Sequence, residues 1–225
     1  MANPLNLVKA LKLIAGNIGK VNKEVNPETF IKALESVAGE AKGGMKINDM
    51  LTQYTPEEYA MMRTFLNPDL KSGFAVKPTE TGKELVSVFS QPSGRGTNLA
   101  TEGVLRGATK LDNYNVGGKL PELYSKAGFE KTNEYPFDPT QVAPHVSDFT
   151  RSLEPSYMEM ALNPKVAEAV SSTRGLTSAE LTKYLKDGTL PAWKKKEIQA
   201  NVLKTVGGLG TIGTAGILSN SYGGK

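Results

Sequence analysis

Residues 84–107 constrain the fold of this chain more than any other segment, because a strand-like run, a glycine-rich turn and a helical run follow one another without interruption. ELVSVFS predicts a buried strand over Glu84–Ser90, and QPSGRG predicts a tight turn before a helix that begins at Thr97 or Asn98. A glycine-rich turn at a helix N-terminus offers unpaired backbone N–H groups and the positive end of the helix dipole. The segment therefore predicts a strand–turn–helix unit that suits a phosphate or pyrophosphate.

The residues of the turn support this interpretation. Gly94 and Gly96 would let the backbone approach an anion closely, and Arg95 would add a positive charge. The spacing matches neither the Walker A motif, which ends in Gly-Lys-Ser/Thr, nor the G-x-G-x-x-G of Rossmann folds. A plain strand-to-helix turn without a ligand is the alternative.

Strands and helices alternate throughout residues 51–150, which we take as the core. A capping threonine, a proline and two glutamates at 55–58 predict a helix that runs to about Leu66 and stops before Pro68. The other expected elements are strands at 73–77, 109–114 and 131–137, and helices at 97–106 and 119–126. This alternation predicts an α/β or α+β unit, and we take α+β as the class.

Two motifs in this core resemble those of the Gcn5-related N-acetyltransferase family. Residues 91–96 are similar to the family's Q-x-x-G-x-G loop, which binds the coenzyme A pyrophosphate, and residues 123–129 (LYSKAGF) are similar to its L-Y-x-x-x-G-F signature. The order of the expected strands and helices also matches. The resemblance covers residues 50–140 and implies a mixed sheet flanked by helices.

The resemblance also implies roles for individual residues in a reaction that uses acetyl-coenzyme A or coenzyme A and no metal. Tyr124 matches the general acid that protonates the departing thiolate, whose conjugate acid has a pKa near that of a phenol. The end of strand 84–90 would pair with the pantetheine arm, and Asn115 lies near a position where the family often keeps an asparagine. The residues implied in cofactor binding are Gln91, Gly94, Arg95, Gly96, Thr97 and Asn98.

A general base for the acceptor amine is harder to assign from the sequence. The one histidine, His145, follows a proline and is expected in a surface loop. Glu84, at the start of its strand, is the best acid that the pattern offers, and water can also serve as the base. Tyr124 has an alternative role as a core aromatic residue beside Leu120 and Phe129.

The two ends of the chain differ from the core. Residues 1–50 predict a helical extension with helices at 1–18 and 27–40, and residues 151–225 predict a helical region with helices at 178–185 and 193–206. Residues 205–224 carry no charge and contain seven glycines. The first helix is expected to pack on the domain or a partner, or to contact a membrane surface. The glycine-rich tail is expected to pack in an assembly, to insert transiently into a membrane or to stay disordered.

Composition excludes several function classes. Among the 225 residues there is no cysteine and one histidine, which excludes disulfide scaffolds, cysteine nucleophiles and clusters of histidine metal ligands. The net charge of +4 is dispersed, and the lysines at 194–196 fit a solvated helix face, so a nucleic acid is not expected as a specific ligand. We find no signal peptide and no transmembrane segment, which favours synthesis in the cytoplasm.

The acetyltransferase-like core and the unusual ends together resemble, in general style, internal virion or ejection proteins of short-tailed bacteriophages. That resemblance implies a structural, ejection-type role without robust catalysis. The protein would be made in the host cytoplasm and carried in the virion, with other virion proteins or copies of itself as partners. An active acetyl-coenzyme A-dependent N-acetyltransferase that stays in the cytoplasm is the alternative.

Overall fold

The computed structural model describes residues 22–39, 41–42, 45–91 and 94–173, together with the single positions 192 and 196. The strands are β1 (Lys23–Val25), β2 (Ala41–Lys42), β3 (Met45–Lys46), β4 (Arg63–Leu66), β5 (Ser72–Thr79), β6 (Gly82–Ser90), β7 (Lys110–Asn115), β8 (Phe129–Tyr135) and β9 (Ser156–Leu162). The helices are α2 (Pro27–Ala38), the short 3₁₀ helix η1 (Ile47–Met50), α3 (Pro56–Ala60), α4 (Gly96–Leu105), α5 (Lys119–Lys126), α6 (Asp148–Ser152) and α7 (Pro164–Thr173).

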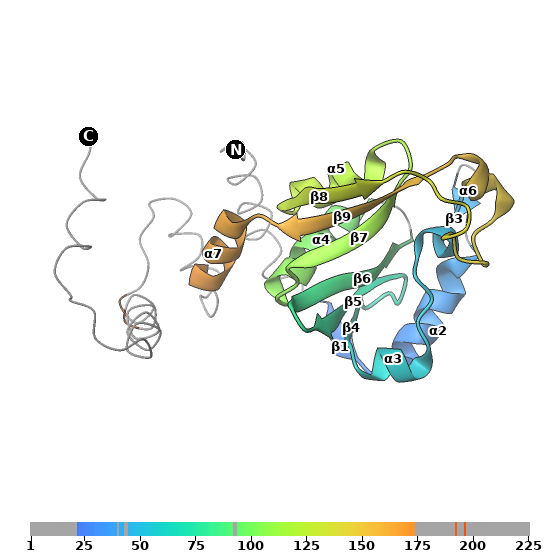
Figure 1. Cartoon of the computed structure of the whole chain (residues 1–225). Coiled ribbons are helices and arrows are strands. Elements are labelled where there is room, and N and C mark those ends of the chain that lie inside the picture. Colours follow the sequence, from blue (N-terminus) through green and yellow to red (C-terminus); the bar gives the residue numbers. More distant parts are fainter. Residues whose placement is uncertain are drawn as a thin grey trace.

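Seven of these strands form one mixed sheet in the order β1-β4-β5-β6-β7-β9-β8, and β2 and β3 form a separate pair. Neighbouring strands of the large sheet run antiparallel, except β6 and β7, which run parallel. Helices flank this sheet (Figure 1). The predicted α+β class with a mixed sheet is therefore confirmed. The expected succession of strand, turn, helix, strand, helix and strand is present as β6, α4, β7, α5 and β8.

Each face of the sheet carries a hydrophobic core. Helices α4, α5 and α7 cover one face, where the buried side chains include Phe65, Phe74, Val104, Phe129 and Met160. Helices α2 and α3 cover part of the other face, where the buried side chains include Phe30, Val37, Leu66, Val86 and Phe89. Within the described residues, no helix is long and apolar enough to cross a membrane.

Local signals explain where several helices begin. Asn26 caps α2 by accepting a hydrogen bond from the Thr29 N–H at 2.8 Å, and Pro27 occupies the first helical position. At α3, the Thr55 hydroxyl accepts from the Glu58 N–H, and the Glu58 carboxylate accepts from the Thr55 N–H. This reciprocal pair satisfies two backbone donors that the helix itself leaves unpaired.

The helix expected from Thr55 to Leu66 is wrong over its second half. Helix α3 ends at Ala60, and residues 63–66 form β4 between β1 and β5. Phe65 and Leu66 point to opposite faces and are each almost wholly buried. Burial on both faces of a sheet outweighs the helical pattern of the local sequence.

The sheet extends beyond the expected core of residues 51–150 at both ends. Strand β1 comes from the expected N-terminal extension, and the region expected to be helical after residue 150 contributes β9 between β7 and β8. Asn22 ties the start of β1 to α4, because its backbone N–H and side-chain amide donate to the buried Glu102 carboxylate at 3.0 and 2.7 Å. The seven strands of the large sheet therefore extend from Lys23 to Leu162, and this sheet has a hydrophobic core on each face.

Four features expected from the sequence lie outside the described residues. These are the helices at 1–18, 178–185 and 193–206 and the glycine-rich tail at 205–224. The helix expected at 27–40 is α2, which ends at Ala38, and the helix expected at 119–126 is α5 with those same bounds.

Candidate functional site

Strands β6 and β7 part shortly after they meet. The Thr109 N–H donates to the Lys83 carbonyl at 2.8 Å, and Glu84 pairs with Lys110. Over the rest of the two strands, which the structure describes fully, no further pair forms between them, and Figure 1 shows them diverging. The facing edges of both strands therefore have backbone groups without a partner strand in the middle of a sheet, where such groups are normally paired.

A β-bulge in β6 lies on the wall of this gap. Gly73 of β5 pairs with Phe89 and Ala75 pairs with Val86, so Ser87 and Val88 oppose one residue, Phe74. Ser87 has a φ of 51°, which is unusual for a residue with a side chain, and its hydroxyl bonds to the Tyr59 hydroxyl at 2.8 Å. Bulges of this kind bend a strand and re-aim its side chains, and they are frequent next to binding sites.

The gap between β6 and β7 holds a cavity of about 300 Å³, which we call the wedge cavity. Side chains from both hydrophobic cores line it, including Leu85 and Tyr124 from one face and Leu51, Val86 and Phe89 from the other. A cavity that touches both cores passes between the strands rather than lying on one face of the sheet. Met45, Ile47, Met50 and Thr52 complete one side of its wall.

Asn113 of β7 is the least expected residue in this wall. The residue is 7% exposed, and neither its amide nitrogen nor its amide oxygen has a hydrogen-bond partner. Leaving a buried donor or acceptor unpaired costs about 1–3 kcal/mol. An amide offers one donor and one acceptor function to a ligand, so Asn113 is suited to bind a complementary amide in the wedge cavity.

Asn115, the asparagine that the resemblance favours, is used differently. Its side-chain oxygen accepts from the Gly118 N–H at 2.9 Å, and its amide nitrogen donates to Glu134 at 3.1 Å. These bonds stabilise the turn between β7 and α5, and Asn115 is not among the residues that line the wedge cavity. The asparagine that lines the cavity is Asn113, two residues earlier on β7.

Tyr124 is both a core residue and a wall of the wedge cavity. Its ring packs edge-on against Phe129 with centroids 6.5 Å apart, as the core alternative predicts. The same residue lines the cavity from α5. Burial, followed by the negative charge of Asp112, raises the pKa of the Tyr124 hydroxyl above its usual range. The phenol stays protonated at neutral pH, and the shift makes it a weaker acid than a free phenol.

Asp112 is an acid in the wedge cavity that sequence reasoning missed. It lies on β7, lines the cavity and accepts a short hydrogen bond from the Tyr157 hydroxyl of β9. Glu84, the acid favoured by the sequence, lies instead at the closed end where β6 and β7 pair. Burial, then the charge of Asp112, raises the pKa of Glu84. Alternation along β7 places Asp112 and Tyr114 on one face and Leu111 and Asn113 on the other, which is a signal that the sequence contains.

The glycine-rich turn leads from β6 into α4, with residues 92 and 93 outside the described part. The first α-helical hydrogen bond runs from the Leu99 N–H to the Arg95 carbonyl, so the N–H groups of Gly96 and Thr97 have no acceptor within the helix. Gly94 has a φ of 118°, and a Cβ at Gly96 would lie 2.4 Å from Leu123 Cδ1. Gly94 thus permits the turn, whereas Gly96 permits close packing of α4 on α5.

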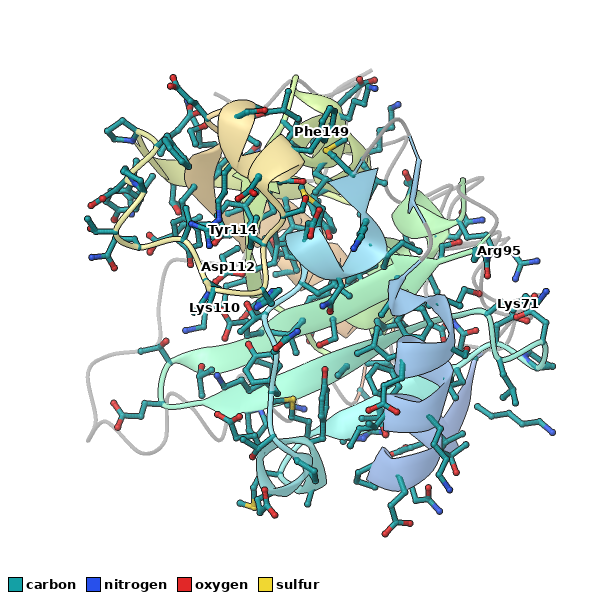
Figure 2. The ribbon with its side chains drawn as sticks, turned by 90° about the vertical axis from the view of Figure 1, so that its right-hand side faces the viewer. Lys71, Arg95, Lys110, Asp112, Tyr114 and Phe149 are labelled. Carbon is teal, nitrogen blue, oxygen red and sulfur yellow. The ribbon has the colours of Figure 1, made fainter. Side chains whose placement is uncertain are left out.

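Arg95 is already engaged at this turn. Its guanidinium donates to the Asp69 carboxylate at 2.6 Å and to the Ser72 hydroxyl at 3.1 Å. Gln91 is held by its backbone N–H, which donates to the Lys71 carbonyl at 2.8 Å. Figure 2 shows Arg95 and Lys71 at one edge of the molecule, away from Asp112 and Tyr114. The predicted anion-binding residues thus form a rim outside the wedge-cavity wall, where Asp69 balances the charge of Arg95.

Two buried polar contacts hold the segment beside the wedge cavity in place. Asp49 of η1 accepts hydrogen bonds from the Ser147 N–H and hydroxyl and from the Thr150 hydroxyl, at 2.6–3.1 Å. His145 lies in a loop, as expected, but it is half-buried, and its Nε2 lies 3.1 Å from the Leu51 carbonyl. Residues 47–51 are therefore fixed to the 145–150 segment.

Comparison with known proteins gives limited information. No protein-family model matches the chain, and no curated protein matches it. Among solved structures, a Bacillus subtilis acetyltransferase in complex with CoA is 14% identical, with a TM-score of 0.36, and the match covers 51% of this chain and 95% of that one. A protein assigned as a phosphinothricin N-acetyltransferase is 13% identical, with a TM-score of 0.35, and the match covers 59% and 93%. Matches at this identity and TM-score carry no argument about the function of this chain.

Proposed function

We propose that the wedge cavity binds the thioester arm of an acyl-coenzyme A and that the protein transfers the acyl group to an amine. The observation that carries this proposal is the parting of β6 and β7 around the buried, unpartnered amide of Asn113. A ligand that brings amide groups into the gap would satisfy both the strand edges and Asn113. The pantetheine arm of coenzyme A is a narrow chain with two amides, and it fits this requirement.

The rim of the cavity suits the charged end of the same ligand. The N–H groups at the start of α4 and the positive end of its dipole favour an anion, and Arg95 and Lys71 add positive charge nearby. Asp69 competes for Arg95 in the structure described. A pyrophosphate that binds at this rim would therefore take Arg95 from Asp69.

The side chains of the wedge cavity can manage the protons of an acyl transfer. The coenzyme supplies the acyl group in an activated form, as a thioester. Tyr124 lines the cavity with a protonated hydroxyl that can bond to a departing thiolate and pass it a proton, and Asp112, fixed by Tyr157, can accept a proton from an amine. In the balanced reaction of a neutral amine, a C–N bond forms, the C–S bond breaks, and one proton passes from the nitrogen to the sulfur. An amine that binds as an ammonium ion first gives up a further proton, which Asp112 can accept and release to solvent.

Two measurements on the full chain test this proposal. Calorimetry with coenzyme A tests binding. Thiol release from acetyl-coenzyme A with butylamine as acceptor tests transfer, and a thiol reagent can follow it directly because the chain contains no cysteine. We expect saturable binding, and we expect Tyr124→Phe to lower the rate about a hundredfold with coenzyme A affinity unchanged. Tyr54→Phe, a half-buried tyrosine outside the wedge-cavity wall, is the matched control.

Absence of coenzyme A binding would overturn the whole proposal. Binding without thiol release would overturn the transfer step and favour a core that keeps a cofactor site without catalysis. The ejection-type virion role stays a prediction, because the terminal segments that suggested it lie outside the described residues.

A further inference from the structure

We infer that a second cavity, lined by Tyr114, Tyr135, Phe137 and Tyr157 with Asp138 at its wall, is the acceptor site and takes a cationic amine. This inference rests on the proposed acyl transfer, because it names the class of acceptor for the same reaction. The cavity has a volume of about 460 Å³, and we call it the tyrosine cavity. Its walls come from β7, the end of β8, the loop after β8, and the start of β9.

The tyrosine cavity adjoins the wedge cavity through a shared wall. Tyr114 and Tyr157 line both cavities, and they are direct cross-strand partners whose ring centroids lie 6.1 Å apart. The Tyr157 hydroxyl donates to Asp112, which lines the wedge cavity. A molecule held in the tyrosine cavity is therefore separated from the proposed thioester site by two side chains, and Asp112 lies on the thioester side of Tyr157.

The aromatic lining suits a cation. The Tyr135 ring lies 6.1 Å from the Tyr157 ring at an angle of 37°, and Tyr114 stands at 71° to Tyr157. Rings at these angles present faces as well as edges to the space between them, and an ammonium group is attracted to ring faces. Tyr135 is 47% exposed and marks the entrance.

The charges around the tyrosine cavity favour the same class of ligand. Hydrogen bonds from Thr140 lower the pKa of Asp138, so this carboxylate at the wall is ionised at neutral pH. Asp112 and Glu159 are direct cross-strand partners, and like charges so placed are unfavourable. Burial first, then the hydrogen bond to Asp112, and then the charges of Asp112, Glu159 and Glu84 raise the pKa of Tyr157. A bound ammonium group would relieve this repulsion.

The neighbouring cations leave room for such a ligand. The positive charges of Lys77 and Lys110 partly offset the rise in the pKa of Glu84 that burial causes, and Lys110 donates to the Thr81 hydroxyl at 3.2 Å. The positive charge of Arg151 partly offsets the rise in the pKa of Tyr114 that burial causes. The Arg151 guanidinium itself is held by the Val146 and Ala143 carbonyls, to which it donates at 2.9 and 2.8 Å. Among the described residues, no lysine or arginine lines the tyrosine cavity.

A matched pair of probes tests this inference without an activity assay. The full chain, labelled with ¹⁵N, is titrated with butylammonium and separately with 1-butanol, which has a similar chain length without the charge. We expect butylammonium to shift the backbone amide resonances of residues 135, 137, 138 and 157 in a saturable way, and to bind about fivefold more tightly than butanol. Equal affinity for the two probes would overturn the assignment of a cation, and no shift at these residues would overturn the site.

Two variants sharpen the result. Tyr135→Leu keeps an apolar side chain but removes a ring face, and it should weaken butylammonium binding roughly two- to fivefold. Phe149→Leu is the control, because Phe149, labelled in Figure 2, is an aromatic residue of similar exposure, 45%, and it does not line the cavity. An equal loss in both variants would overturn the inference. If coenzyme A bound and butylammonium did not, the proposed function would stand and this inference would fail. If butylammonium bound and coenzyme A did not, the cation site would stand and the proposed function would fail.

Discussion

Asn113→Leu is the most informative substitution in this chain, because stability and ligand binding should change in opposite directions. Leucine has the same number of side-chain heavy atoms as asparagine, so the variant replaces the two unpartnered polar atoms with methyl groups and preserves the shape of the wall. Removing an unpaired buried polar group should raise the free energy of unfolding by about 1–3 kcal/mol. For a domain of this size, the midpoint of thermal unfolding should rise by about 2–4 °C per kcal/mol.

The same substitution should weaken coenzyme A binding about tenfold, because it removes one or two hydrogen bonds worth about 0.5–1.5 kcal/mol each. Thermal unfolding followed by circular dichroism measures the first effect, and calorimetry measures the second. Asn115→Leu is the control on the same strand. It loses the bonds to Gly118 and Glu134, so it should lower stability and leave coenzyme A binding unchanged.

Two outcomes would refute this reasoning. If Asn113→Leu lowered stability, the amide would be satisfied in the folded protein and the argument from an unpaired group would fail. If stability rose but coenzyme A affinity stayed the same, Asn113 would not contact the ligand, and the wedge cavity would lose its main support as a thioester site.

Three further predictions concern stability and the rim of the site. Asp49→Ala should lower the free energy of unfolding by about 3 kcal/mol in urea titrations, because it leaves buried donors of Ser147 and Thr150 unpaired. Burial alone would raise the pKa of Asp49, but the hydrogen bonds from Ser147 and Thr150 outweigh burial and lower it. The wild type should therefore be more stable than Asp49→Asn above the usual carboxyl pKa, and this difference in stability should vanish as the pH falls through the lowered pKa. A difference that stayed constant down to acid pH would contradict this. Gly73→Ala should destabilise the fold by about 2 kcal/mol or more in the same assay, since its Cβ would lie 2.5 Å from the Phe65 carbonyl oxygen, and wild-type stability would contradict the packing at the bulge. Asp69→Asn should release Arg95 and raise coenzyme A affinity about threefold by calorimetry, with stability changed by less than about 1 kcal/mol because the ion pair is exposed; unchanged affinity would mean that Arg95 does not meet the ligand.

The elements from β5 to β8 could be predicted from the sequence because their signals are local. Helix α5 lies at its predicted bounds, and β6 and α4 flank the glycine-rich turn as expected. Strands β4 and β9 could not be predicted in the same way, since both depend on neighbours that are distant in the chain. Strand β9 (SYMEMAL) is rich in helix formers, and only the alternation of Met158, Met160 and Leu162 toward the core indicates a strand.

The candidate site was predictable only in part. The motif pointed to the turn at 91–96, whose described residues lie outside the wedge-cavity wall, and to Tyr124, which lines the cavity. Asp112 and Asn113 were missed because their importance comes from the parting of β6 and β7, which no local pattern encodes. The sequence does contain one signal. Asn113 lies two residues after the buried Leu111, so it faces the same core, and a polar residue at such a position indicates a site.

The side-chain amide resonance of Asn113 gives the most direct test of the central claim. Titration of ¹⁵N-labelled full-length protein with coenzyme A should shift this resonance in a saturable way, because the ligand supplies the partners that the amide lacks. The Asn115 side-chain resonance, already bonded in the turn, should move little. An Asn113 resonance that stays fixed while coenzyme A binds elsewhere, or does not bind, would contradict the account.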